Sequence, residues 1–392
     1  MMLPRSIAAA APLLLLLLLL APFCAAAEPG LTATTITFGQ AAALSGPAAV
    51  LGSEVRRGLL AAFDEANARG GVNGRRLELI SRDDGYEPEA SAAATRQLID
   101  QDHVFALAGA VGTPPSLAAL PIARDAGVPF VGAFTGADIL RLPANGNVVN
   151  LRASYAEEAE FMVAHLRQDL GITRIGILYQ DDSFGRAGLS GLQQALGKRG
   201  LKLAAEGSFE RNTRAVKTAL ALIRRAAPEA VIMFGPYGPC AAFVALAREL
   251  RFNPVFLASS FTGLAPLAQE LGAGAAGIYH TQVVPLPADS PSSAAADYRA
   301  ALAARDPKAF PDAVGFEGYL VGRLIVAALA AAGAQPTRQS FLAAIAGHEF
   351  DLGGVRADFR APGNQAAAQI SLAVITRDGK ARTITNLTAA TN

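Results

Sequence analysis

Two short apolar runs in the first half of the chain each end in a turn that carries hydroxyl-bearing or small residues. Residues 104–108 are followed by a glycine-containing turn and by Thr113, which we expect to cap a helix. Residues 128–133 lead into the second turn. Neighbouring parallel strands would bring both turns to one sheet edge, where helix N-termini attract polar or anionic ligands. The residues expected to face that crevice are Thr113, Ser116, Phe134, Thr135 and Gly136.

Signatures of catalysis are missing or misplaced. The string Gly272-x-Gly274-x-x-Gly277 resembles a dinucleotide fingerprint, but it follows a predicted helix and precedes a strand, which is the reverse of the required order. The four histidines lack metal-ligand spacing. Adjacent turn carboxylates such as Asp83-Asp84 are better explained as caps or solvated residues. We therefore predict a protein that is not an enzyme, with no catalytic residue, no metal and no cofactor.

The composition indicates a well-packed globular protein. Hydrophobic residues make up 52% of the 392 positions and charged residues 17%. This mixture allows a large core and argues against disorder. The net charge is +1 with no basic stripe, so nucleic acid is not an expected partner.

The N-terminus has the pattern of a secretory signal peptide over residues 1–27. Arg5 precedes an unbroken run of leucines, and three alanines before Glu28 suit a cleavage site. We expect cleavage before Glu28 and a periplasmic protein. One alternative is an uncleaved membrane anchor, although the apolar run is shorter than the ~20 residues of a membrane span. The other is lipid attachment at Cys24, although the bulky Phe23 is unlike a lipoprotein signal. Cleavage would leave Cys240 alone, and we interpret it as a small buried residue.

Strand and helix patterns alternate along most of the remaining chain. Residues 35–133 contain four apolar strand patterns separated by three amphipathic helix patterns, which is typical of a doubly wound parallel unit. The same alternation restarts near Val148 and continues to about 284. A Pro/Ser/Ala stretch then leads into helices, and the run 321–333 is predicted to be a core helix. The segments 354–359 and 370–376 are predicted to form a β-hairpin.

Several segments, in order along the chain, resemble the leucine/isoleucine/valine-binding-protein family. These are the type I solute-binding proteins of bacterial ABC importers. The segments that carry the resemblance are ITFGQAAALSGPAAVLG, DEANARGGVNGRRLELISRDD, HVFALAGAVGTPPSLAALPIARDAGVPFVGAFTG, ILYQDDSFGRAGLSGLQQALGKRG and GGVRADF. They extend over essentially all of the chain after the signal pattern.

The resemblance implies an α/β protein with two doubly wound parallel-sheet lobes joined by a three-crossover hinge. Lobe 1 would comprise residues 28–150 and 285–349, and lobe 2 residues 151–284 and 350–392. It also implies that a small-molecule ligand is captured by hinge closure and delivered to an ABC permease in the inner membrane. We expect a monomer. The alternative function is a ligand-sensing module of the same fold that signals to a membrane partner.

The family's ligand contacts can be carried over to individual positions. The first-loop contact falls on Ser45 and Gly46, and the hydroxyl that grips a ligand carboxylate falls near Thr113. Thr135 and the backbone of residues 134 and 136 would assist it. The lobe 2 aromatic residues fall on Phe184 and Tyr237. Tyr155 is a further candidate for an aromatic lining of the cleft.

The position that binds an amino acid's ammonium group in the family falls on or next to Ser260, where an acidic residue is expected. A desolvated ammonium without a charge partner is costly, so a free amino acid is disfavoured. Pro114 and Pro115 also remove two N–H donors from the anion site. We therefore favour an apolar or aromatic carboxylate as the ligand. An amino acid stays an option if Asp182 supplies the missing charge.

Overall fold

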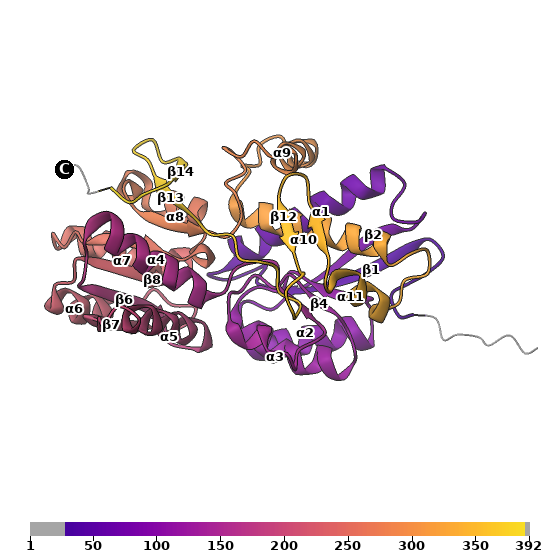
Figure 1. Ribbon diagram of the computed structural model, residues 1–392, viewed down its shortest axis with the longest axis horizontal. Coiled ribbons are helices and arrows are strands. Elements are labelled where there is room, and N and C mark those ends of the chain that lie inside the picture. The colour runs from indigo at the N-terminus through magenta and orange to yellow at the C-terminus, as the bar shows by residue number, and fades with distance from the viewer. Residues whose placement is uncertain (1–27, 389–392) are drawn as a thin grey trace, which may run out of the picture.

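The computed structural model describes residues 28–388, so the signal-peptide prediction and Cys24 lie outside the described residues. The chain forms two α/β lobes that lie end to end (Figure 1). The sheet of lobe 1 has five strands in the order β2-β1-β3-β4-β5, and every pairing is parallel. Its strands are β1 (Thr35–Ala42), β2 (Arg76–Asp83), β3 (Ala106–Ala108), β4 (Phe130–Val131) and β5 (Val148–Val149).

The sheet of lobe 2 has seven strands in the order β14-β13-β10-β9-β8-β6-β7. The central strands pair in parallel, and β13 and β14 add two antiparallel strands at one edge. The strands are β6 (Ile175–Gln180), β7 (Ala205–Phe209), β8 (Ala230–Phe234), β9 (Val255–Ala258), β10 (Tyr279–Gln282), β13 (Ser371–Ile375) and β14 (Ala381–Ile384). The predicted fold class of two doubly wound lobes is therefore confirmed.

Helices cover both faces of each sheet, as right-handed βαβ crossovers require. In lobe 1, α2 and α3 lie on one side of the sheet and α1 and α10 on the other (Figure 1). The helices of lobe 1 are α1 (Ala49–Ala68), α2 (Pro88–Asp100), α3 (Thr113–Asp125), α9 (Ser293–Arg305), α10 (Ala313–Ala331) and α11 (Arg338–Ile345), with the 3-10 turn η2 (Asp138–Arg141). Those of lobe 2 are α4 (Tyr155–Leu170), α5 (Ser183–Gly197), α6 (Lys217–Ala226), α7 (Tyr237–Glu249) and α8 (Leu264–Leu271), with the 3-10 turns η3 (Ser260–Thr262) and η4 (Gly272–Ala275).

Glycines let α10 pack closely against α1 in the core of lobe 1. A Cβ atom on Gly58 would lie only 1.9 Å from the carbonyl oxygen of Gly315, and one on Gly318 would lie 2.3 Å from that of Val55. Among the described residues, α10 is the one helix that is long and apolar enough to cross a membrane, but 72% of its most apolar window is buried. The sequence-based assignment of this segment as a core helix is confirmed.

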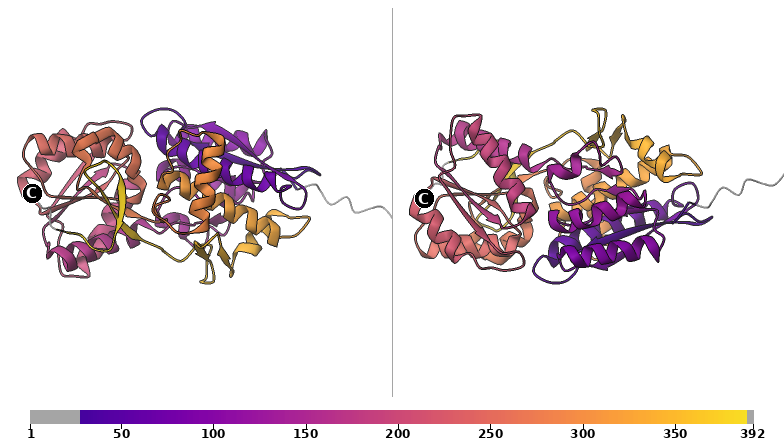
Figure 2. Two further views of the ribbon diagram at one scale, coloured as in Figure 1. Left: turned by 90° about the horizontal axis from the view of Figure 1, so that it is seen from above. Right: turned by 90° about the horizontal axis from the view of Figure 1, so that it is seen from below.

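Three chain segments cross between the lobes, at residues 150–154, 283–292 and 360–370 (Figure 2). The third crossover differs from the expected boundary at 349–350. A two-stranded ribbon of β11 (Glu349–Asp351) and β12 (Arg356–Asp358) precedes it, and this ribbon contacts lobe 1, where the N–H of Ala294 donates to the carbonyl of Gly353 (2.9 Å). Residues 350–359 therefore lie with lobe 1.

The predicted hairpin between residues 354–359 and 370–376 is wrong. Strand β12 pairs with β11 on lobe 1, whereas β13 pairs with β10 and β14 in lobe 2. Each segment is an alternating apolar strand, and such a pattern does not specify its partner. A turn at Asp378-Gly379 joins β13 to β14.

Candidate ligand-binding cleft

The carboxyl ends of the parallel strands in both sheets point toward the junction of the two lobes. Strands β1, β3 and β4 deliver the turns of lobe 1 to this junction, and β6, β8 and β9 deliver those of lobe 2. This edge is where open parallel sheets bind ligands, because the strands end there and helices begin. The candidate cleft is therefore built from turns that are distant in sequence.

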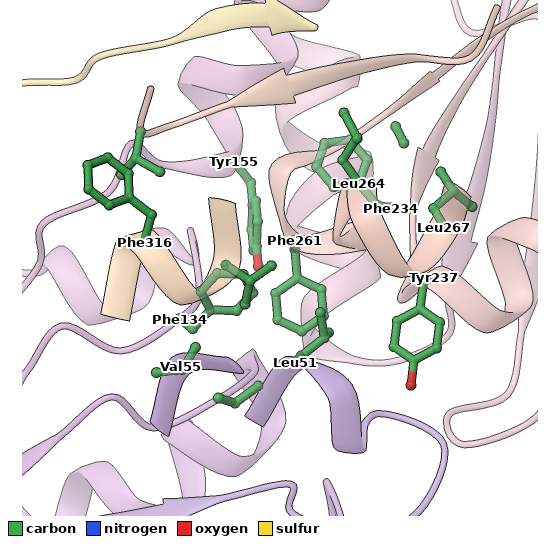
Figure 3. Packing of buried hydrophobic residues seen from close by; sticks show 14 of the residues in the cluster. Leu51, Val55, Phe134, Tyr155, Phe234, Tyr237, Phe261, Leu264, Leu267 and Phe316 are labelled. Atoms are coloured by element: carbon green, nitrogen blue, oxygen red, sulfur yellow. The ribbon is translucent and has the colours of Figure 1, made fainter. Parts of the chain in front are cut away.

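Aromatic side chains fill the centre of the cleft. The ring of Phe134 in lobe 1 lies 5.4 Å from that of Phe261 in lobe 2, and both are at most 2% exposed (Figure 3). Phe261 also contacts Tyr86 of lobe 1, at 6.2 Å, and Phe184 of lobe 2, at 4.5 Å. Tyr155 packs against Phe184 at 5.1 Å. The lobes thus meet through an aromatic cluster, which includes three residues expected to line the cleft.

A pair of hydroxyl groups lies beside this cluster. The Oγ1 atoms of Thr113 and Thr135 are 2.6 Å apart, and the Thr135 hydroxyl also reaches the Tyr155 hydroxyl at 3.4 Å. The Oγ of Ser116 is buried and has no hydrogen-bond partner among residues 28–388. Gly136 packs under Tyr155, and a Cβ there would lie 2.7 Å from the ring. The two turns predicted from the sequence to lie side by side therefore do so.

The start of α3 differs in one respect from the expectation. Gly112, with φ +91°, is the N-cap, and Thr113 is the first helical residue instead of the cap. Only glycine adopts such a conformation at low cost, and an added Cβ would collide with Tyr86 at 2.1 Å. Pro114 and Pro115 occupy the next two positions, so two of the first three helical residues carry no N–H. This helix end is poor in donors for an anion.

Ser260 lies at the hinge end of the cleft and is bound to a carboxylate that the sequence analysis missed. Glu158, in the first turn of α4, accepts hydrogen bonds from the N–H of Ser260 (2.9 Å) and from its hydroxyl (2.7 Å). Thr281 donates a third hydrogen bond to Glu158, at 2.5 Å. Both oxygens of this fully buried carboxylate are thereby used. The carboxylate next to Ser260 therefore comes from helix α4 and not from the turn that carries Ser260.

A buried arginine completes this group. Arg152, in the first crossover, donates to the Ser260 hydroxyl, and its guanidinium lies 4.4 Å from the ring centre of Phe134. Its Nε is 3.4 Å from Oε1 of Glu317, which projects from α10. Burial raises the pKa of Glu317 to about 7, although the positive charge of Arg152 partly opposes the shift. His280 lines the same space, and burial lowers its pKa to about 4, so that its ring is neutral at pH 7.

Ser260, His280 and Glu317 line a cavity of about 10 Å³. Its lining includes Phe134, Ser260, His280, Gln282 and Glu317, together with apolar residues of α8, α10 and the second crossover. This volume has room for about one water molecule, so an organic ligand would require the lobes to separate or the aromatic side chains to move.

Asp182, the alternative charge partner for an amino acid, is already engaged. Its carboxylate caps α5 through the N–H of Phe184 (2.9 Å) and accepts a hydrogen bond from Gln180 (2.6 Å). Arg211 lies 3.4 Å away as an ion-pair partner. Burial nevertheless raises the pKa of Asp182.

The remaining predicted contacts lie on the rim. Ser45 and Gly46 are exposed, and the N–H of Ser45 donates to Asp83 (3.1 Å). Tyr237 begins α7 and is 6% exposed; burial raises its pKa, while a hydrogen bond with the backbone of Val50 in lobe 1 lowers it in part. In Figure 3 its ring lies to one side of Phe261, apart from the rings of Phe134 and Tyr155. The structure therefore brings the predicted residues into a central group and an outer group.

Two parallel-sheet lobes joined by three crossovers, with polar and aromatic residues between their carboxyl edges, define a two-lobed ligand-binding protein. The family model described as "Periplasmic binding protein" matches residues 35–380, and the chain belongs to this family. The resemblance to Leu/Ile/Val-binding proteins is thereby confirmed. Membership indicates a periplasmic solute-binding protein.

Solved structures match nearly the whole chain. A possible leucine/isoleucine/valine-binding protein from Rhodopirellula baltica SH 1 is 40% identical, with a TM-score of 0.85 over 90% of this chain and 96% of that chain. A substrate-binding periplasmic protein from Ralstonia solanacearum is 28% identical, with a TM-score of 0.84 over 89% of this chain and all of the other (100%). The similarity therefore includes both lobes.

A curated relative matches a smaller part. Leu/Ile/Val-binding protein homolog 7 of Brucella abortus (strain 2308) is 26% identical over 247 residues, which is 60% of this chain and 62% of the relative. The match thus spans about three fifths of the relative's length.

Proposed function

We propose that the protein captures a small organic acid with an apolar or aromatic body by hinge closure and delivers it to an ABC importer in the inner membrane. The main support for this proposal is the contact of Phe134 with Phe261 across the lobes, beside the hydroxyl pair of Thr113 and Thr135. Aromatic rings offer a large apolar surface to a ligand body, and hydroxyl groups orient its polar end. The names of the relatives, which refer to branched-chain amino acids, support a ligand of this size.

Ser260 and its neighbours favour an acid without an ammonium group. Ser260 carries no charge, and the two oxygens of Glu158 already accept hydrogen bonds from Ser260 and Thr281. Asp182 is likewise occupied by the start of α5 and by Arg211. An ammonium group at either position would have to share a carboxylate that already accepts hydrogen bonds from protein groups.

A thermal-shift screen tests this function. The purified protein is unfolded and refolded to remove carried-over ligand, and it is then heated with aromatic and branched aliphatic carboxylates, their amides and branched-chain amino acids. A ligand at a hundredfold excess over its Kd adds ~2.7 kcal/mol, which raises the Tm by several degrees. We expect the carboxylates to raise the Tm and to be recovered unchanged. A lack of any shift, or turnover of a bound compound, would contradict the proposal.

A further inference from the structure

Arg152 and Glu317 form a buried ion pair at the junction of the two lobes. The two side chains are 1% and 6% exposed, and Nε of Arg152 is 3.4 Å from the nearest Glu317 oxygen, which is longer than a good charge-assisted hydrogen bond. They come from different parts of the fold, because Arg152 lies in the first crossover and Glu317 in α10. Both lie where the lobes hinge.

Arg152 has unused hydrogen-bonding capacity. Its Nη2 donates to Ser260, whereas Nε and Nη1 are buried and have no hydrogen-bond partner in the described part of the chain. Its guanidinium lies over the face of Phe134, a central residue of the aromatic cluster. An arginine held flat against a ring, with unused N–H groups on Nε and on Nη1, can donate to a carboxylate that approaches either edge of the guanidinium. Leaving such donors unpaired is costly, and a ligand would remove that cost.

The other anion-binding feature in the cleft lacks charge. The start of α3 has prolines at two of its first three helical positions, and the Thr113–Thr135 pair is neutral. An anionic ligand therefore needs a positive group from elsewhere in the cleft, and the guanidinium of Arg152 lies against Phe134.

If an anion approaches Arg152, we expect the protonation state of Glu317 to change. The charged groups that face it are Arg152 from the crossover, Glu158 from α4 and Arg141 from the end of η2, and the neutral His280 of β10 lines the same cavity. An added carboxylate would leave this buried group with an excess negative charge. Protonation of Glu317 removes that excess and also makes it a hydrogen-bond donor.

We propose that Arg152 receives the acidic group of the ligand at the hinge end of the cleft, and that Glu317 yields its place on the guanidinium and takes up a proton from solvent as an anionic ligand binds. The inference rests on the proposed function and adds to it. It names the charge partner of the ligand, and it assigns the protein to monoanionic ligands.

The pH dependence of binding is the first test, with phenylacetate as the probe and calorimetry as the measurement. Glu317 has a pKa of about 7, so its protonated share falls roughly tenfold from pH 6 to pH 8. We expect the affinity for phenylacetate to fall by about that factor in the natural protein. Glu317→Gln keeps the size and a donor group, and we expect it to bind tightly at both pH values.

The matched control is Glu65→Gln. Glu65 accepts a hydrogen bond from Tyr319 of the same helix α10 and lies 3.9 Å from Arg323, away from the cleft. This variant should keep the pH dependence of the natural protein. An unchanged pH dependence in Glu317→Gln would overturn the role of Glu317.

Arg152 is tested by a variant that keeps its charge. Arg152→Lys loses the planar fork, and we expect about tenfold weaker binding of phenylacetate at pH 6. Phenylacetamide, the neutral counterpart, should bind the natural protein at least about tenfold more weakly than the acid. Equal binding of acid and amide, or an unchanged affinity in Arg152→Lys, would overturn the role of Arg152.

Two further outcomes separate the inference from the proposed function. If leucine binds more tightly than phenylacetate, and its affinity rises between pH 6 and pH 8, Glu317 holds an ammonium group; the inference is then wrong while solute capture stands. If none of the three probes binds, the proposed ligand class fails, and the inference fails with it.

Discussion

Arg211 of lobe 2 and Glu87 of lobe 1 form an ion pair across the mouth of the cleft, with 2.7 Å between Nη2 and Oε2. The neighbouring Asn212 donates to the other oxygen of Glu87 (2.7 Å) and to the carbonyl of Gly85 (3.1 Å). These contacts join the loop after β7 to the start of α2. Since they can form only when the lobes are together, they favour the closed arrangement.

We expect Glu87→Gln to weaken ligand binding by up to about fivefold, because partly exposed ion pairs contribute about 0.2–1 kcal/mol. Calorimetry with phenylacetate measures the effect. High salt should weaken binding of the natural protein more than that of the variant, since screening acts on the pair. Asp181→Asn, which removes the exposed pair with Arg186 inside lobe 2, serves as the control. Equal affinities in all three proteins would show that the contact does not govern closure.

The ring of Phe261 in lobe 2 contacts the rings of Phe134 and Tyr86 in lobe 1 and so joins the lobes. Phe261→Ala should lower the free energy of unfolding by about 3–5 kcal/mol, the usual cost of removing a buried phenylalanine ring. It should also let the lobes separate, which small-angle scattering would record as a larger radius of gyration. Phe243→Ala is the matched control, because Phe243 is buried in lobe 2 against Phe256. A similar radius in both variants would count against a role of Phe261 in closure.

Tyr237 is proposed as a ligand contact at the rim of the cleft. Tyr237→Ala should weaken binding by ~1–3 kcal/mol, the cost of losing a buried aromatic contact. Tyr237→Phe keeps the ring, so it should retain most of the affinity if the contact is apolar. Titration of the two variants with the same ligand decides the point. An unchanged affinity in Tyr237→Ala would place the pocket elsewhere.

Because of two buried carboxyl groups, we expect the free energy of unfolding to fall as the pH rises above neutrality. Burial and the nearby Asp312 raise the pKa of Glu54 to about 8, and burial raises that of Glu317 to about 7. Each folded-state pKa lies above the value of the unfolded chain, so the folded protein holds protons that the unfolded chain has released. The stabilisation is complete below the unfolded pKa and is lost as the pH passes through the folded value.

Thermal unfolding between pH 6.5 and pH 9 tests this prediction. His280 does not interfere in this window, because its depressed pKa affects stability only at lower pH. We expect the Tm of the natural protein to fall across the window and that of Glu54→Gln to fall less. A Tm that stays level in both proteins would show that these carboxyl groups are not protonated in the fold.

Much of the architecture was predictable because it depends on local pattern. Short apolar runs alternating with amphipathic helices specify parallel sheets, and the two lobes follow from the restart of that pattern near Val148. The side-by-side turns that hold Thr113 and Thr135 were likewise predictable, because adjacent parallel strands deliver their ends to one edge. The choice of a strand's partner depends on residues distant in sequence. For this reason the sequence pattern assigns residues 350–359 to lobe 2, whereas the ribbon of β11 and β12 lies with lobe 1.

The sequence by itself determined the fold class, the two-lobed organisation and the edge at which a ligand would bind. Only the tertiary structure decided which charges meet there. Arg152, Glu158, Ser260 and Glu317 come from a crossover, two helices and a short turn, and they interact within a few ångströms. The physical reason is that secondary structure follows periodicity over neighbouring residues, whereas a buried charge finds its partners through the packing of elements that no local spacing connects.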